Sequence, residues 1–386
     1  MKIIWIVDNK YRELVGLHNI KSELKKQNID LILIHKFNWK SAINFYNPAY
    51  ILVPNLSKNF GEKIILYAKK KKILVISYLS EGLDYSNEFM DKKYNKDVLK
   101  KIDYFFIWSE LEKKYLRKKI NISKKNSFLV GNLKFKREKF LKSKKIKNVG
   151  ILSSTKLITS RFNDNIVDII NNRDKKNDLL NQILDEINYT KIIVQIKNEL
   201  KRKQYNIFFK THPFENSKKY SKLFDKQMIF NGSIREFTKK IDIVINLYSS
   251  SALECLLKNI PVISLEKFQI LNNKRLARIL STRIGLKPKN FMGLFSLLKT
   301  KKEILLKKTI TKNIMKEIKK NVDFTKTEID FVKSFSKLHR YETKKNYWYL
   351  FNYIISEMKV LIFYRRDTLF RSYSYLDQKL LKSFSS

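Results

Sequence analysis

Short apolar runs alternate with amphipathic stretches from the first residues of this 386-residue chain to about residue 265. A run of four to six apolar residues without polar alternation is typical of a strand that is buried on both faces. The stretches between the runs have the 3.6-residue periodicity of helices. The pattern therefore predicts parallel sheets covered by helices, which is an α/β fold. The expected strands are Ile3–Val7, Leu31–His35, Tyr50–Val53, Ile73–Tyr78, Tyr104–Trp108, Ser127–Val130, Val149–Leu152, Asn206–Lys210, Met228–Phe230, Ile243–Asn246 and Pro261–Ser264.

A lysine-rich segment at residues 134–148 interrupts this alternation and is typical of a solvated linker. The chain is too long for one ordinary core, so two α/β domains are expected, at residues 1–146 and 147–325. Two such domains predict the GT-B architecture, in which two Rossmann-like domains face a central cleft, here with a helical C-terminal extension at 326–386. The expected helices of the two domains include Leu14–Gln27, Trp39–Phe45, Phe60–Lys70, Glu110–Lys118 and Tyr189–Lys203.

The charge of the chain is strongly positive, with 81 Lys and Arg against 36 Asp and Glu and a formal net charge of +45. Such an excess suggests nucleic acid or an anionic membrane as a partner. Lysine greatly outnumbers arginine and is spread along the whole chain, whereas base and phosphate recognition relies on the arginine fork. We therefore expect no nucleic-acid partner, and attraction to the inner face of the cytoplasmic membrane or simple compositional drift explains the charge.

The cellular location expected from the sequence is the cytoplasm. The single cysteine, Cys255, excludes an intramolecular disulfide and a cysteine-based metal cluster. The N-terminal residues form a short buried strand and lack the cleavage site of a signal peptide. No stretch of about 18 uninterrupted apolar residues is present, so no membrane span is expected.

The last helical stretch carries apolar residues on one face and leaves two interpretations open. The face would pack back onto the domains, or it would lie in a membrane interface with Arg365 and Arg366 beside it. Glu357 and Lys359 interrupt any span. The residues that share this face are Tyr347, Leu350, Phe351, Ile354, Ile355, Met358, Leu361 and Ile362.

The most informative segment is the sequence Lys-Thr-His-Pro at residues 210–213, which directly follows the expected strand Asn206–Lys210. In an open parallel sheet, ligands bind beyond the carboxyl ends of the strands. Pro213 restricts the backbone at His212 and so orients its imidazole. His212, Lys210 and Thr211 are therefore candidates for contact with the phosphate of a nucleotide, where His212 would stabilise the charge of the leaving group. A surface histidine beside a turn proline is the alternative.

A second candidate segment is the serine cluster Ser249, Ser250 and Ser251, which follows the expected strand Ile243–Asn246 and begins a helix. Backbone N–H groups and hydroxyls at such a junction can bind an anion. Glu254, one turn into the helix, could accept hydrogen bonds from a ribose diol. Serine as a plain helix N-cap is the alternative interpretation.

Two carboxylates of the first domain are candidates for the general base that an acceptor hydroxyl needs. Glu81 follows the strand Ile73–Tyr78 and precedes Gly82, which lets the backbone turn sharply. Asp84 is the second candidate. Glutamate–glycine pairs are also common in ordinary loops, so a structural role is the alternative.

Several motifs of cofactor and metal sites do not occur. The sequence has no Asp-x-Asp pair, no His/Cys cluster at metal-ligand spacing and no Walker or Gly-x-Gly-x-x-Gly loop. We therefore expect no cofactor and no bound metal, and the leaving phosphate would be neutralised by protein groups.

At these segments the chain resembles bacterial surface-carbohydrate biosynthesis proteins and the wider GT-B set of sialyltransferases, Kdo transferases and teichoic-acid glycerophosphotransferases. Bacterial sialyltransferases carry an acidic-acidic-Gly motif, a His-Pro motif and a Ser-Ser/Thr motif in this order, matched here at 80–82, 212–213 and 249–251. The resemblance implies that Glu81 is the base and that His212, Ser249 and Ser250 contact the phosphate of CMP. The first residue of the triplet is serine here, which departs from the pattern.

Two weaker similarities to the surface-carbohydrate proteins lie in the first domain. Residues 130–135, Val-Gly-Asn-Leu-Lys-Phe, are similar to their Gly-Asn-Pro-Arg-Phe-Asp segment, although Pro, Arg and Asp are all altered. Residues 11–14 contain an Arg-Glu-Leu that these proteins have near their N-terminus. The resemblance covers roughly residues 1–270.

The function expected from the sequence is an inverting, metal-independent glycosyltransferase that uses a nucleotide-activated, CMP-linked sugar to build a surface polysaccharide such as a capsule or lipopolysaccharide. Its partners would be the nucleotide-sugar donor and a glycolipid or oligosaccharide acceptor. Two alternatives would bind a nucleotide-activated substrate in the same way: a CDP-glycerol or CDP-ribitol phosphotransferase and a UDP-sugar 2-epimerase. A basic nucleic-acid-binding protein and a degenerate transferase kept as a scaffold are alternatives of other classes.

Overall fold

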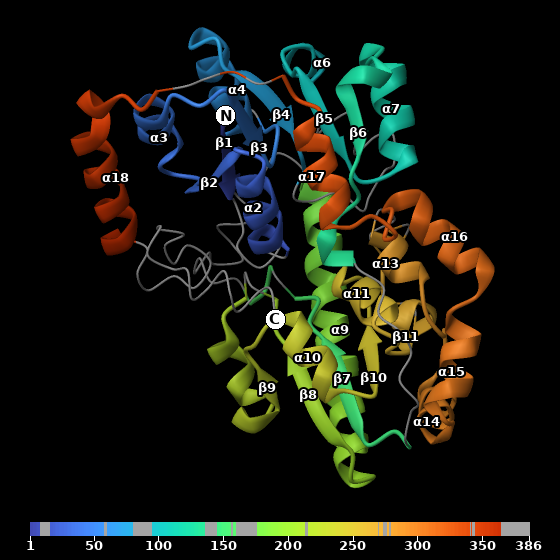
Figure 1. Ribbon diagram of the computed structural model, residues 1–386. Coiled ribbons are helices and arrows are strands. Elements are labelled where there is room, and N and C mark those ends of the chain that lie inside the picture. The colour runs from blue at the N-terminus through green and yellow to red at the C-terminus, as the bar shows by residue number, and fades with distance from the viewer. Residues whose placement is uncertain are drawn as a thin grey trace. The chain divides into compact units, whose positions relative to one another are not determined.

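The chain forms two compact units, each built on its own parallel sheet (Figure 1). Unit 1 comprises residues 1–136 and 318–386, and unit 2 comprises residues 137–317, so that the boundary falls within the helix α16 (Lys312–Asn321). The computed structural model describes residues 1–7, 16–57, 60–79, 95–135, 145–155, 157–159, 176–212, 215–268, 270–272, 276–277, 279–339, 341 and 344–363.

Unit 1 contains a six-stranded parallel sheet in the order β2-β1-β3-β4-β5-β6. Each predicted strand forms within a residue or two of its expected ends, because a strand buried on both faces appears in the sequence as an unbroken apolar run. The strands are β1 (Lys2–Val7), β2 (Asp30–His35), β3 (Tyr50–Val53), β4 (Leu74–Ser77), β5 (Tyr104–Ile107) and β6 (Ser127–Leu129).

Helices cover both faces of this sheet. One face packs on α3, α4 and α7 through a core of Ile, Leu, Val and Phe side chains. The other face packs on α2 and α17, where Phe331 stacks on Trp5 at 6.0 Å between ring centroids and Phe335 meets Phe106 at 4.9 Å. The helices of unit 1 before residue 136 are α2 (Leu17–Lys26), α3 (Trp39–Tyr46), α4 (Gly61–Lys70), α6 (Lys96–Leu99) and α7 (Glu110–Ile120), and two that follow unit 2 are α17 (Glu328–Ser336) and α18 (Leu350–Phe363).

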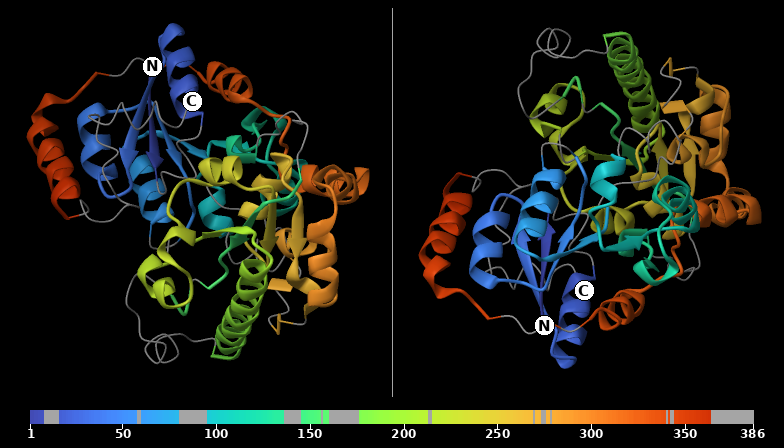
Figure 2. Two further views of the ribbon diagram at one scale, coloured as in Figure 1. Left: turned by 90° about the horizontal axis from the view of Figure 1, so that it is seen from below. Right: turned by 90° about the horizontal axis from the view of Figure 1, so that it is seen from above.

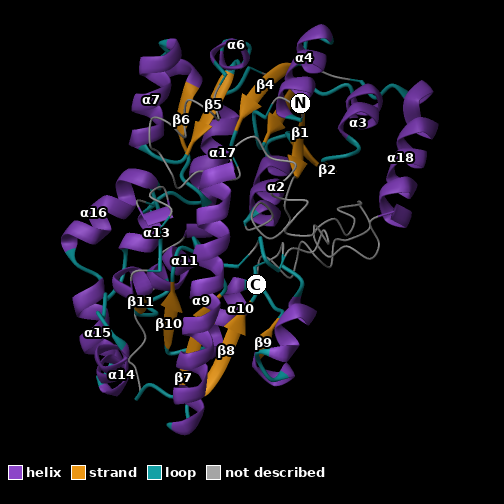
Figure 3. Cartoon of the chain, turned by 180° about the vertical axis from the view of Figure 1, so that it is seen from behind, coloured by secondary structure: helices purple, strands orange, loops and turns teal. Residues whose placement is uncertain are grey.

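Unit 2 contains a five-stranded parallel sheet in the order β11-β10-β7-β8-β9. The helix α9 (Lys176–Arg202) packs along one face of this sheet and begins 13 residues before the expected start at Tyr189 (Figure 3). The strands are β7 (Asn148–Leu152), β8 (Asn206–Lys210), β9 (Ile229–Phe230), β10 (Ile243–Asn246) and β11 (Val262–Ser264). The other helices are α10 (Ile234–Lys240), α11 (Ser251–Leu257), α13 (Leu280–Arg283), α14 (Phe291–Lys299) and α15 (Lys302–Thr309).

The close packing of α10 on the second face of this sheet depends on a glycine in β7. A Cβ atom on Gly150 would lie 2.7 Å from Cζ of Phe237 and 2.8 Å from Cδ1 of Ile241. Both side chains are buried, so neither can move aside freely. Gly150 therefore sets the distance between the central strand and its covering helix.

The C-terminal helix α18 lies along α3 on unit 1 (Figure 2). It contacts the core through Leu350 and Tyr353, and Tyr349 just before the helix packs there as well, whereas Phe351, Ile354 and Met358 of the expected apolar face are exposed. Over the residues that the structure describes, no helix has the length and apolar character needed to cross a bilayer.

Candidate functional site

Three neighbouring strands of unit 2 end in polar side chains at the same edge of the sheet. In the order β8-β7-β10 these ends are Lys210–His212, Ser153–Thr155 and Ser249–Ser251. All three strands are parallel, so their carboxyl ends lie together. Adjacent strands are about 4.8 Å apart, so β8 and β10 are separated by about 10 Å. The two segments expected from the sequence thus flank a third segment of hydroxyls on β7.

A buried carboxylate fixes the turn that carries His212. The amide of His212 donates to Oε2 of Glu215 at 2.8 Å, and the amide of Glu215 donates to the carbonyl of His212 at 2.9 Å. The other oxygen of Glu215 accepts from the Ser153 hydroxyl at 2.7 Å and from the Thr155 amide at 3.1 Å. Glu215 therefore joins the ends of β8 and β7, and burial raises its pKa.

The lysine at the end of β8 is held by a backbone carbonyl of the same turn. Nζ of Lys210 donates to the carbonyl of Thr211 at 3.1 Å, and the Lys210 side chain is half-buried. Thr211 is buried, and His212 is half-buried. The end of β8 consequently presents one fixed cation and one imidazole at the sheet edge, which is a suitable combination for binding a phosphate.

The serine cluster after β10 is shaped by an asparagine at the end of the strand. Oδ1 of Asn246 accepts from the Ser249 amide at 2.9 Å, and its Nδ2 donates to the carbonyl of Ser281 at 2.8 Å. Ser250 is the N-cap residue of α11, yet its side chain makes no capping hydrogen bond and is exposed. The plain N-cap interpretation therefore does not account for the hydroxyl of Ser250.

Glu254 lies in the first turn of α11 and is buried. Burial keeps its carboxylate out of contact with solvent. The nucleotide-binding role of Glu254 stays a prediction, as do the roles of the other residues expected from the sequence.

A second buried carboxylate lies behind the ends of β7 and β10. Oε2 of Glu186 accepts from the amides of Leu157 and Ile158 at 2.9 and 3.1 Å. The hydroxyl of Tyr248 lies 3.0 Å from Oε1 of Glu186 and 2.7 Å from the carbonyl of Ser154. One hydroxyl proton cannot serve both acceptors, so a proton on Glu186 completes the network.

The protonation of Glu186 agrees with its environment. Burial raises the pKa of Glu186 to about 7, against the lowering effect of its hydrogen bonds. Burial also raises the pKa of Tyr248 well above its ordinary value. Near neutral pH, Glu186 can therefore gain or lose a proton next to the two central strand ends.

Glu81 and Asp84, the two candidates for the general base, lie outside the described residues, as do Gly82 and Pro213. The structure therefore brings together the predicted residues of unit 2 only, and the choice of base stays a prediction.

Sequence reasoning missed three parts of this edge: the hydroxyl segment Ser153–Thr155, Glu215 and Glu186. The first could have been found by the signal used for Ser249–Ser251, because hydroxyls also follow the buried strand at Val149–Leu152. Glu215 lies three residues after His212, a spacing at which a carboxylate side chain can accept a hydrogen bond from a nearby backbone amide. Glu186 lies in the middle of a helix and carries no signal in the sequence.

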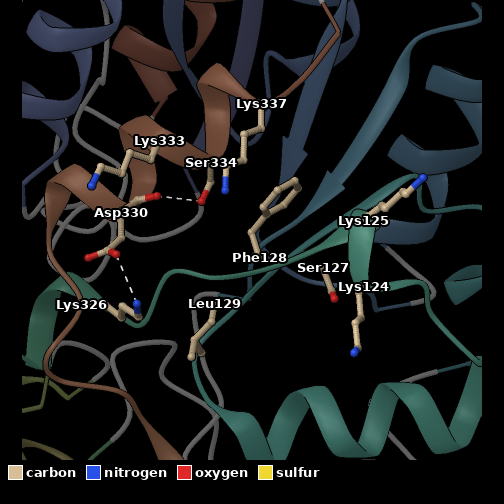
Figure 4. A pocket seen from close by; sticks show the side chains of 10 residues that line it. All are labelled: Lys124, Lys125, Ser127, Phe128, Leu129, Lys326, Asp330, Lys333, Ser334 and Lys337. Carbon is tan, nitrogen blue, oxygen red and sulfur yellow. Dashed lines mark hydrogen bonds and ion pairs between the residues drawn. The ribbon is translucent and has the colours of Figure 1, made fainter.

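A basic hollow of about 480 Å³ lies in unit 1, between β6 and α17 (Figure 4). It is lined by five lysines and by Asp330, which pairs with Lys326 at 3.2 Å. Such a surface attracts anions of many kinds. It contains none of the residues expected from the sequence to form the site. The lysines are Lys124, Lys125, Lys326, Lys333 and Lys337.

Within the part of the chain that the structure describes, no group of three or more His, Cys, Asp or Glu side chains could hold a metal ion.

Two Rossmann-like parallel sheets with interleaved helices define an α/β fold of the GT-B type. Among solved structures, the chain is similar to UDP-GlcNAc 2-epimerase from Methanocaldococcus jannaschii, with a TM-score of 0.53, 18% identity and coverage of 87% of this chain and 99% of that one. It is similar to the complex of S. aureus MnaA with UDP, with a TM-score of 0.51, 12% identity and coverage of 89% and 99%.

A third similar structure is the wall teichoic acid polymerase TagF, as its H444N variant soaked with CDPG. The TM-score is 0.51, the identity is 10%, and 87% of each chain is covered. No protein-family model matches the sequence. No curated protein matches it either. These similarities establish the fold.

Proposed function

We propose that this protein is a glycosyltransferase that binds a nucleotide-activated sugar at the carboxyl edge of the sheet of unit 2. The observation that carries the proposal is the meeting of three strand ends there, with His212 and Lys210 on one side and the serine cluster on the other. Positive charge and hydroxyl donors on adjacent strands suit a phosphate. The similar structures support a nucleotide ligand, because one contains UDP and another was soaked with CDPG.

In the proposed reaction, the acceptor hydroxyl displaces the nucleotide from the anomeric carbon with inversion, without a metal ion. His212 donates a hydrogen bond to the departing phosphate and Lys210 neutralises its growing charge. Glu81, or else Asp84, removes the proton from the acceptor hydroxyl. Ser249, Ser250 and Ser251 hold the nucleotide phosphate, and Thr211 and Glu254 complete the nucleotide site. The donor would be a CMP-linked sugar, and the product a surface polysaccharide.

The test is a panel of CMP-, CDP- and UDP-activated donors incubated with the purified full-length chain, with and without an oligosaccharide acceptor. Acceptor-dependent release of nucleotide is expected, and His212→Ala should lower kcat by about 10²- to 10³-fold. His339→Ala is the matched control, because His339 is exposed and lies in unit 1. Equal turnover in His212→Ala and wild type would contradict the proposed site.

A UDP-sugar 2-epimerase is the second candidate function, favoured by the similarity to UDP-GlcNAc 2-epimerase. An epimerase changes the sugar of its donor without any acceptor. Proton NMR of UDP-GlcNAc incubated with the enzyme alone separates the two functions: new sugar signals support the epimerase, whereas acceptor-dependent product supports the transferase.

A further inference from the structure

A strip of large apolar side chains on and just before α18 faces solvent. Trp348 is 86% exposed and Phe351 is 71% exposed, which is unusual for side chains of this size. We call this set the α18 strip. It consists of Tyr347, Trp348, Phe351, Ile354 and Met358.

The opposite side of α18 already attaches the helix to unit 1. Tyr353 stacks on Phe45 at 5.3 Å with an interplanar angle of 17°. The side chains of Glu357 and Ser356 both hydrogen bond to Asn38, at the start of α3. Within the strip, Tyr347 also meets Phe45, at 6.1 Å between ring centroids, and is therefore left unchanged in the test. Trp348, Phe351 and Met358 are 86%, 71% and 53% exposed, so changes at these three residues should leave the fold intact.

The charges around the strip are positive. Lys344 and Lys345 precede it and Lys359 follows Met358, all three exposed. The only acidic residue between Lys344 and Phe363 is Glu357, which is directed toward Asn38. An anionic partner would consequently meet no negative charge on this helix.

We propose that the α18 strip docks the protein on an anionic lipid surface, which goes beyond the proposed transferase function. The aromatic rings would lie among the headgroups, where Trp and Tyr are favoured, and the lysines would contact anionic lipids. The 14 residues of α18 span about 21 Å, less than a hydrocarbon core of about 30 Å, so the helix lies along the surface. A second copy of the chain is disfavoured as the occupant because two molecules of net charge +45 repel each other.

The experiment uses the full chain with phosphatidylcholine vesicles that contain or lack 30% phosphatidylglycerol, without any nucleotide. Trp348 is a built-in probe, because Trp5 and Trp108 are buried and Trp39 is partly buried. We expect a blue shift of tryptophan fluorescence with anionic vesicles only. In the variant Trp348→Phe the shift should disappear while co-sedimentation persists.

Loss of the strip should weaken binding more than loss of exposed apolar side chains elsewhere. Phe351→Ser with Met358→Ser should reduce co-sedimentation at least tenfold, whereas Met292→Ser, at an 82% exposed residue of α14, should have no effect. Lys344→Glu with Lys359→Glu should weaken binding on the order of tenfold or more.

Two outcomes would overturn the proposal. One is equal vesicle binding by the wild type and the Phe351/Met358 variant. The other is a change from dimer to monomer in that variant by light scattering with vesicle binding unchanged, which would assign the strip to a second copy. Failure of the transferase proposal is separable, because turnover with a soluble acceptor needs no vesicle.

Discussion

The amide of His212 is bonded to the carboxylate of Glu215, and the amide of Glu215 is bonded back to the carbonyl of His212. This reciprocal pair closes the turn after β8, and the second oxygen of Glu215 extends it to the end of β7. The orientation of the imidazole thus depends on a carboxylate that never reaches the surface.

Substitution of Glu215 by glutamine should destabilise the protein. Each oxygen of Glu215 faces a backbone N–H group, one of His212 and one of Thr155, and an amide nitrogen cannot accept from either. One buried N–H group would be left without an acceptor, which costs about 1–3 kcal/mol. Urea unfolding measures the loss, with the exposed Glu303→Gln as the control variant. A value for Glu215→Gln within error of the control would contradict this account.

Substitution of Glu186 by glutamine should be tolerated, although Glu186 is equally buried. Both backbone N–H groups bond to Oε2, so the position of Oε1 can carry an N–H group that donates to the Tyr248 hydroxyl. The Gln182 amide, which donates to Oε1 in the wild type, can turn and present its oxygen to this group. The free energy of unfolding at pH 5 should change by less than about 1 kcal/mol. A loss as large as that of Glu215→Gln would refute the proton assignment to Glu186.

The stability of the protein should fall between about pH 4.5 and 7 because of Glu186. The pKa of Glu186 is raised from 4.5 in the unfolded chain to about 7 in the folded state. In this window the folded protein keeps a proton that the unfolded chain has released, so the free energy of unfolding decreases as the pH rises. The shift corresponds to a loss on the order of 3 kcal/mol across this window. Thermal unfolding at several pH values should show a flatter profile for Glu186→Gln than for the wild type.

Ser250 and Ser233 offer a matched pair for separating ligand binding from helix capping. Ser233 caps α10 in a capping box with Glu236, whereas Ser250 makes no capping bond at α11. Ser233→Ala should cost about 1 kcal/mol of stability and leave the KM for the donor unchanged. Ser250→Ala should leave stability unchanged and raise the KM several-fold. The reverse pattern would assign Ser250 to the helix and remove it from the proposed site.

Gly150→Ala tests the packing of β7 against α10. The added methyl group would lie within 3 Å of both Phe237 and Ile241. Overpacking of this kind costs about 1–3 kcal/mol. A denaturation midpoint equal to that of the wild type would show that α10 can move away from the strand.

The sequence was sufficient to predict the strands, but it did not predict the buried side-chain contacts at the strand ends. Val149–Leu152 and Ile243–Asn246 were predicted because burial on both faces leaves an unbroken apolar run. Glu215 and Glu186 were missed because the sequence does not distinguish a buried carboxylate from a surface one, and because each has partners far away in the sequence, such as Ser153 for Glu215 and Tyr248 for Glu186. The apolar residues of α18 were recognised, but periodicity cannot tell which side of a helix meets a core. Phe351 and Met358 of the expected face are exposed, whereas Leu350 of that face and Tyr353, outside it, pack against the core.

The helix α17 completes the hydrophobic covering of a sheet whose strands all lie before residue 130. During synthesis, the ribosome must therefore add about two hundred further residues before Phe331 and Phe335 emerge to shield Trp5 and Phe106. Unit 2 is continuous in sequence and can finish folding first, although the chain that precedes it was made earlier. A fragment ending at residue 136 should accordingly aggregate, whereas the same fragment mixed with a peptide of residues 318–339 should regain solubility.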